Sequence, residues 1–188
     1  KKKNQTILFH AAAGGVGLLA SQWAKSVGCN MIGTVSNDEK AELAKKNGCK
    51  YVINYKKEDV VEKVKEITNG VGVPVVYDGV GKDTFKKSLE CLDFRGLFVS
   101  FGQSSGMVPK VNLHKTFNPK SLYYTRPTLM HYNLNRNQLV KSSNLLFKKI
   151  INKQLKSHIF KSIDLKKASE AHRLIESRKS FGSIILKP

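Results

Sequence analysis

Short apolar runs alternate with helical patterns along most of the chain. The runs that read as strands lie at residues 6–9, 31–35, 51–53, 73–77 and 97–101. Between them, apolar side chains recur at helical spacing in segments 16–27, 39–46, 60–68 and 83–92. Strands that alternate with helices form βαβ units, whose strands lie parallel in one sheet. The pattern therefore predicts an α/β fold with a doubly wound parallel sheet of the Rossmann type.

The last third of the chain has a looser pattern. After a glycine turn and an irregular stretch, the predicted elements are a strand, two helices and a final strand, at 121–125, 134–151, 165–177 and 184–186. A chain of 188 residues without an internal repeat suits a single domain. We expect a Rossmann core over about 1–133 and a C-terminal extension of helices and a strand over 134–188.

The composition indicates a folded protein with no membrane partner. Apolar residues make up 40% of the chain, and no apolar run approaches the roughly 20 residues that a membrane helix needs. A cytoplasmic location is expected. The net charge of +19 comes mostly from lysines spread along the whole chain, and no nucleic-acid-binding motif accompanies it. Nucleic acid is therefore not favoured as a partner, although the charge should attract an anionic phosphate cofactor.

The three cysteines, Cys29, Cys49 and Cys91, are isolated in the sequence. None belongs to a CxxC pair or has a histidine at metal-ligand spacing. We expect neither a disulfide framework nor a bound metal, and interpret the three thiols as buried hydrophobic groups of a reducing compartment.

The segment 10–17 (HAAAGGVG) stands directly between a predicted strand and a predicted helix. In a dinucleotide site, small residues permit a tight turn and close helix–strand packing, and backbone amides at the helix start meet the pyrophosphate. Ala12, Gly14 and Gly17 occupy the three small positions, with alanine in the first. An ordinary strand-to-helix turn is the alternative interpretation, and the surrounding βαβ pattern favours the dinucleotide site.

The end of the second predicted strand indicates which dinucleotide is bound. An NAD enzyme usually has an acidic residue there, which accepts a hydrogen bond from the ribose 2′-hydroxyl. Here the strand ends in Val35 and Ser36, and Asp38 and Glu39 are expected in the first turn of the next helix, facing its dipole. Lys40 could reach a 2′-phosphate and Ser36 could donate to it, although Lys40 could equally be a solvated surface lysine. NADPH is therefore favoured over NADH.

Several blocks in order resemble the quinone oxidoreductase branch of the medium-chain dehydrogenases/reductases, the zinc-free group that includes zeta-crystallin. The blocks are residues 9–25 (FHAAAGGVGLLASQWAK), 53–55, 76–81, 99–106, 121–127 and 176–178. The resemblance covers essentially the whole chain. It implies direct hydride transfer from NADPH to a quinone, without a metal.

The same resemblance implies a cofactor site in three parts. The pyrophosphate is expected at Ala13, Gly14, Gly15, Val16 and Gly17, and the 2′-phosphate at Ser36, Lys40, Tyr55 and Arg178. The nicotinamide end is expected at Val80, Phe101, Gly102, Gln103, Ser104 and Ser105, with Arg126 in a neighbouring block. Purely structural roles stay open: Tyr55 as a strand cap, Val80 and Phe101 as core, and Arg178 as a partner of Glu176.

No catalytic residue is identified. The five histidines have no evident Asp or Ser partners in the sequence, and Asp78 is expected to hold a turn through its carboxylate. Members of the family begin with a GroES-like catalytic domain, which we expect to be absent here. A homodimer through the strand at 121–125, or a catalytic-domain partner from a split gene, is expected. The alternatives are an inactive NADPH-binding fragment, an enoyl or alkene reductase, and an RNA-binding zeta-crystallin-like protein.

Overall fold

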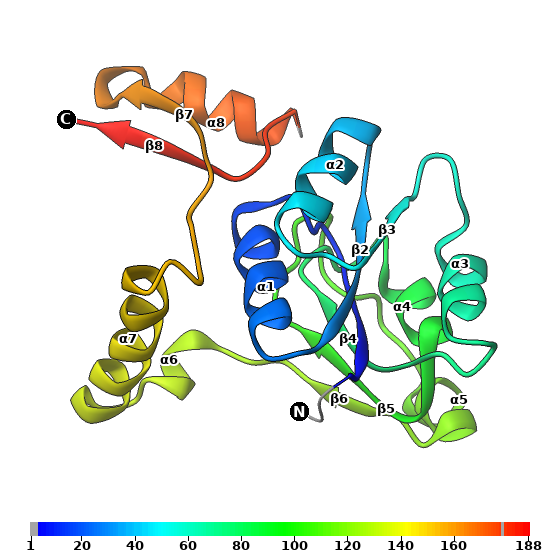
Figure 1. Ribbon diagram of the computed structural model, residues 1–188. Helices are drawn as coiled ribbons and strands as arrows, with labels where there is room; N and C mark the ends of the chain where they lie inside the picture. Colours follow the sequence, from blue (N-terminus) through cyan, green and yellow to red (C-terminus); the bar gives the residue numbers. More distant parts are fainter. Residues whose placement is uncertain (1–3, 178) are drawn as a thin grey trace.

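The computed structural model describes residues 4–177 and 179–188. Its centre is a parallel sheet of six strands in the order β3-β2-β1-β4-β5-β6 (Figure 1). The strands are β1 (Thr6–Phe9), β2 (Asn30–Val35), β3 (Tyr51–Asn54), β4 (Val73–Asp78), β5 (Leu92–Ser100) and β6 (Tyr123–Thr125). The chain reverses its direction of winding between β1 and β4, and ligands of open α/β sheets bind outside the carboxyl ends of the strands at such a point. The predicted Rossmann-type sheet is confirmed.

Helices cover both faces of this sheet. They are α1 (Gly15–Ser26), α2 (Asp38–Lys46), α3 (Val60–Ile67), α4 (Phe85–Cys91) and the short α5 (Leu113–Phe117). Strand β1 shows how the faces are divided: Leu8 packs in the cluster that includes Val64 of α3, while Phe9 packs in the cluster that includes Ala24 of α1. Because side chains alternate along a strand, a continuous apolar run serves both layers.

Two boundaries of the predicted elements are wrong for reasons of backbone geometry. Strand β5 begins at Leu92 and continues past Arg95, which has a φ of 57°, whereas the apolar pattern places its start at 97. At the other edge, Ser121 is left-handed, with a φ of 50°, and ends a short 3-10 turn, η1 (Asn118–Lys120). Strand β6 therefore begins at Tyr123, two residues later than predicted.

The C-terminal residues form elements outside the central sheet. These are α6 (Leu129–Tyr132), α7 (Arg136–Ile151), β7 (Ile159–Asp164), η2 (Leu165–Lys167), α8 (Ala168–Glu176) and β8 (Ser183–Lys187). Strands β7 and β8 pair parallel in a second sheet, and β7 and the short helices α5 and α6 were not predicted. In Figure 1 helix α7 stands beside α1, and none of its residues is buried. Among the described helices, none is long and apolar enough to cross a bilayer.

The last segment of the chain returns to the glycine turn. The amide of Gly182 donates to the carbonyl of Ala13 at 2.9 Å, and Gly14 and Gly182 form an isolated parallel bridge. The residues before β8 thus lie against the start of α1.

Candidate dinucleotide-binding site

The glycine turn places an open helix start at the carboxyl end of β1. Gly14 is the N-cap of α1 and supplies no side-chain acceptor. The amide of Leu18 donates to the carbonyl of Gly14 at 2.9 Å, so the amides of the three residues before Leu18 have no carbonyl one turn back. Val16 at this end is 64% exposed. Amides without an intrahelical acceptor and the positive end of the helix dipole suit a negatively charged phosphate group.

Close packing explains why the turn consists of small residues. A Cβ atom on Gly17 would lie 2.5 Å from the carbonyl oxygen of Ala11 and 2.6 Å from that of Ala12. Ala12 is fully buried, and its Cβ would lie 2.5 Å from a Cβ added to Gly33 of β2. The helix start is therefore pressed against β1 and β2, as the spacing of small residues predicts.

The C-terminal segment borders this turn on one side. A Cβ atom on Gly15 would lie 2.8 Å from the side-chain oxygen of Ser183 and 3.4 Å from the carbonyl oxygen of Gly182. Glycine at position 15 leaves room for the C-terminal segment.

Three of the residues predicted to bind the 2′-phosphate follow the carboxyl ends of neighbouring strands. Ser36 follows β2, and Tyr55 follows β3 with its amide donating to the carbonyl of Val35 at 3.1 Å. Lys40 lies in the first turn of α2, where its amide donates to Oδ1 of the N-cap Asn37 at 2.9 Å. Burial lowers the pKa of the Lys40 ammonium group. The fourth predicted residue, Arg178, lies outside the described residues.

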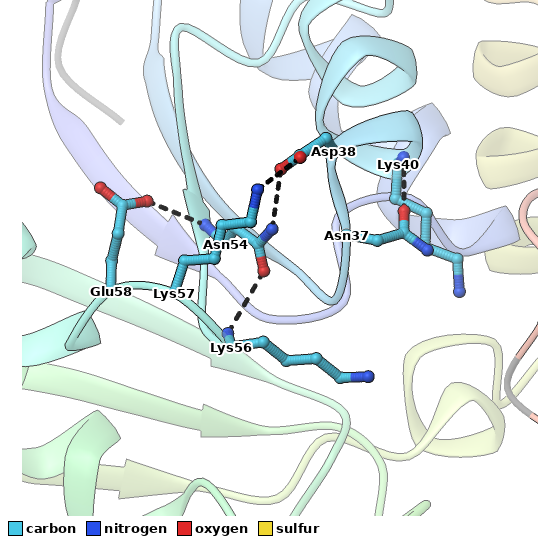
Figure 2. A network of polar contacts seen from close by, with 7 residues as sticks. All are labelled: Asn37, Asp38, Lys40, Asn54, Lys56, Lys57 and Glu58. Atoms are coloured by element: carbon cyan, nitrogen blue, oxygen red, sulfur yellow. Dashed lines mark hydrogen bonds and ion pairs between the residues drawn. The ribbon is translucent and has the colours of Figure 1, made fainter.

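Asp38 points away from Lys40 and toward the end of β3 (Figure 2). Its Oδ1 accepts from Asn54 Nδ2 at 2.9 Å, and its Oδ2 accepts from Lys57 Nζ at 2.6 Å. We call Asp38, Asn54 and Lys57 the Asp38 network. The hydrogen bond from Lys57, followed by that from Asn54, lowers the pKa of the Asp38 carboxyl group. Asp38 and Glu39 do lie in the first turn of α2, as expected.

The other end of the site lies where β4 and β5 end. Oδ1 of the buried Asp78 accepts from the amides of Val80 at 2.8 Å and Gly81 at 3.0 Å, which confirms that this carboxylate holds the turn. A Cβ on Gly79 would lie 2.9 Å from the ring of Phe101, so the two turns are in close contact. Phe101 also packs on the ring of Phe9, with 5.4 Å between centroids, which favours a packing role for its ring.

Arg126 organises the turn after β5. Its Nη1 donates to the carbonyls of Ser100 at 2.8 Å and Gly102 at 3.4 Å, and its Nη2 donates to Gln103 Oε1 at 3.3 Å. The amide of Ser104 donates to the carbonyl of Gly79 at 3.2 Å. The predicted residues of the 102–104 turn are therefore held beside the β4 turn. Gln103 and Arg126 also line an apolar cavity of about 570 Å³ that reaches to α5, which the sequence did not indicate.

The expectation that His10 has no Ser or Asp partner is wrong. His10 is buried, with Nδ1 3.0 Å from Thr34 Oγ1 and Nε2 3.0 Å from Ser88 Oγ. Ser88 donates to Asp78 Oδ2 at 2.7 Å, so Nε2 must carry the hydrogen that is donated to Ser88. Burial lowers the pKa of His10, with Asp78 acting in the opposite direction. Burial thus favours the neutral imidazole, which links the end of β1 to Thr34 of β2 and to Ser88 of α4, and through Ser88 to Asp78 of β4.

The partners of His10 are 24 and 78 positions away, so no sequence spacing could reveal them. The sequence did contain one indication that His10 is buried. It stands between an apolar strand and a turn of small residues, a position that the fold covers. The amide of Ala11, which has a φ of 57°, lies 3.3 Å from Thr34 Oγ1. The same buried cluster thus supports the first residue of the glycine turn.

Known proteins match this arrangement. A sequence profile described as zinc-binding dehydrogenase matches residues 15–148. The chain belongs to the zinc-binding dehydrogenase family. It is 50% identical over 189 residues to quinone oxidoreductase 1 of Escherichia coli and 43% identical over 188 residues to a 2-haloacrylate reductase of a Burkholderia species. All of the chain matches in both cases, but it spans only 58% and 56% of those relatives.

Solved structures of this zinc-binding dehydrogenase family agree with the fold. The crystal structure of Escherichia coli quinone oxidoreductase complexed with NADPH matches with a TM-score of 0.96 at 51% identity, over 100% of this chain and 58% of that one. Pseudomonas syringae quinone oxidoreductase matches with the same TM-score at 47% identity and the same coverage. The predicted relationship to quinone oxidoreductases is confirmed, and the Rossmann-type sheet fits the cofactor-binding half of that superfamily.

The described residues do not form a site for the zinc that the family's description names. Within residues 4–177 and 179–188, no group of three His, Cys, Asp or Glu side chains could hold a metal ion. Cys29, Cys49 and Cys91 are buried and free of disulfides, as expected. Burial raises the pKa of the Cys49 and Cys91 thiols to about 12, which disfavours the thiolate that zinc requires.

Proposed function

We propose that the chain is the cofactor-binding part of an NADPH:quinone oxidoreductase. The observation that carries the proposal is the start of α1, where the amides of the first three residues have no intrahelical acceptor and Gly17 is close-packed. A relative about half identical to the chain, the quinone oxidoreductase of Escherichia coli, has been solved with NADPH. NADPH supplies the hydride in such a reaction, and the protein supplies binding and orientation.

Each part of the site has a separate task in this proposal. The amides of Gly15, Val16 and Gly17 bind the pyrophosphate, assisted by the helix dipole, and Ala13 and Gly14 shape the turn before them. Ser36, Lys40 and Tyr55, at the ends of β2 and β3, bind the adenosine 2′-phosphate, and Lys40 contributes a charge-assisted hydrogen bond. The turns that contain Val80 and residues 101–104 flank the nicotinamide, and Arg126 keeps the second turn in place.

Calorimetric titration of NADPH into the full chain tests this proposal. A Gly15→Asp variant adds a negative charge at the start of α1 and presses its Cβ on Ser183, and we expect it to lose detectable binding. Asn69→Asp is the matched control, because it adds the same charge at an exposed left-handed position after α3. At a hundredfold excess over the dissociation constant, NADPH should stabilise wild type by about 2.7 kcal/mol. Equal affinities of wild type and Gly15→Asp would contradict the proposal.

Quinone-dependent oxidation of NADPH, followed at the absorbance of the reduced nicotinamide, tests the second half of the proposal. The chain spans 58% of the quinone oxidoreductases that it matches, so binding and turnover are separate questions. Binding without turnover would favour the alternative of an NADPH-binding part that lacks activity on its own.

The hydride acceptor has a second candidate class. The similarity to a 2-haloacrylate reductase favours an activated carbon–carbon double bond as the alternative acceptor. Parallel assays with a benzoquinone and with 2-chloroacrylate, under the same NADPH concentration, distinguish the two classes. Turnover with the acrylate alone would replace the quinone in this proposal.

A homodimer through β6 is also proposed. β6 is at the edge of the sheet, and Tyr123 on it is 62% exposed. An exposed strand edge can pair with the same strand of a second copy. Light scattering of the chain should give twice the mass of 21.0 kDa, and a monomer at all concentrations would contradict it. The cytoplasmic location and the split-gene partner stay predictions.

A further inference from the structure

The Asp38 network connects the start of α2 to the turn that follows β3 (Figure 2). Each carboxylate oxygen of Asp38 has a donor, and both donors come from the β3 side. Asn54 is buried, so its amide group is fixed, whereas Lys57 and Asp38 form an exposed ion pair. The carboxylate is therefore directed by a buried amide and neutralised by a lysine.

Asn54 also orders the turn that carries Tyr55 and Lys56. Its side-chain Oδ1 accepts from the backbone amide of Lys56 at 3.2 Å, and its backbone amide donates to Glu58 Oε2 at 3.2 Å. A side chain that donates to Asp38 with one end and accepts from this turn with the other fixes both at once. Asn54 is a positioning residue on the adenosine side of the site.

Two lysines point to the side opposite Asp38. In Figure 2 the side chains of Lys40 and Lys56 extend toward the same side of the view, away from the carboxylate. Burial lowers the pKa of Lys40, the charge of Glu39 raises it, and the charge of Lys56 lowers it. Two ammonium groups directed to the same side suit a phosphate dianion better than a neutral hydroxyl group.

We propose that Asn54 and Lys57 make the site selective for a 2′-phosphorylated nucleotide by holding and neutralising the Asp38 carboxylate. A carboxylate released from these bonds, next to the end of β2, could accept from a ribose 2′-hydroxyl and would repel a 2′-phosphate. Lys56 joins Lys40 as a contact for that phosphate. This inference rests on the proposed NADPH-binding function and assigns roles to Asn54, Lys56 and Lys57 within it.

The test is the ratio of the dissociation constants of NADH and NADPH, measured by calorimetry on the full chain. Lys57→Met leaves Asp38 charged but without its ion-pair partner, and we expect the ratio to fall about three- to fivefold, in line with the strength of exposed ion pairs. In Asp38→Asn there is no carboxylate to neutralise. Adding Lys57→Met to Asp38→Asn should therefore change the ratio by less than about twofold.

Lys87→Met is the matched control. Lys87 forms a comparable exposed ion pair with Asp59, at 3.3 Å, between α4 and the start of α3. Its loss removes the same charge and should leave the ratio unchanged. An equal effect of Lys57→Met with and without Asp38, or equal effects of Lys57→Met and Lys87→Met, would contradict the inference alone. A wild-type chain that binds neither nucleotide would contradict the proposed function and with it this inference.

Discussion

The starts of α1 and α2 are both proposed to bind phosphate groups, but they offer different kinds of binding group. At the start of α1 the groups that we propose to bind phosphate are backbone amides, held by close-packed small residues and supported by the buried cluster around His10. At the start of α2 they are half-buried or exposed side chains, beside an Asp38 carboxylate whose direction is fixed by Asn54 and Lys57. The first site consists of backbone groups, so we expect it to lose phosphate binding only when the local fold is disturbed. The second can change with single surface substitutions.

The largest effect is expected from the buried support of the first site. Asp78→Ala removes an acceptor shared by the amides of Val80 and Gly81 and by the hydroxyls of Thr84 and Ser88. Buried donors without acceptors each cost about 1–3 kcal/mol, so the free energy of unfolding should fall by about 3 kcal/mol or more. Urea denaturation measures this free energy of unfolding. The exposed Asp83→Ala is the control, and equal losses in the two variants would contradict this account.

Gly17→Ala should disturb the glycine turn directly. The added Cβ would lie 2.5 Å from a backbone oxygen that no side-chain rotation can relieve. Overpacking of this kind costs about 1–3 kcal/mol, and displacement of the helix start should weaken NADPH binding at least about tenfold. At Gly14 the nearest atom to an added Cβ is at 3.3 Å, so Gly14→Ala should be milder. Thermal melting measures the loss of stability in both variants, and calorimetry measures their loss of NADPH affinity.

The pH dependence of stability tests whether His10 is neutral. Because burial lowers its pKa in the folded state, the unfolded chain binds more protons below the ordinary histidine pKa. The stability that His10 contributes is therefore complete above about pH 6.5 and is lost as the pH falls, by up to about 1.4 kcal/mol per pH unit. His10→Gln should reduce that slope between pH 6.5 and 5, while the exposed His131→Gln should leave it unchanged. An identical slope in all three proteins would show that His10 takes up its proton without loss of the fold.

The smallest effect is expected at the second site. Lys40→Met removes one charge-assisted contact with the 2′-phosphate, and NADPH affinity should fall about five- to tenfold with little change for NADH. The fold should stay intact, since Lys40 contributes its backbone amide, and not its side chain, to the helix cap. Parallel titrations with both nucleotides measure the change. Equal losses for both would assign Lys40 to general attraction of anions.

The same contrast decides what could be predicted from the sequence. Strand β1, the small-residue turn and α1 follow from local rules, because apolar periodicity and steric demand act over a few residues. The early start of β5 depends on the pairing of Leu92 with Val73 of β4, and the left-handed Ser121 closes a 3-10 turn that the apolar pattern does not indicate, so the starts of β5 and β6 were misplaced. The His10 cluster joins His10 to Ser88 and, through Ser88, to Asp78, and the Asp38 network joins Asp38 to Asn54 and Lys57. Only the folded sheet brings those polar groups together.

The central claim is that backbone amides at the start of α1 bind the pyrophosphate of NADPH, and amide NMR tests it most directly. In a nitrogen–proton correlation spectrum of the labelled chain, we expect the largest shifts on NADPH addition at Gly15, Val16 and Gly17. Saturable binding with those three resonances unmoved would place the nucleotide elsewhere and contradict the account.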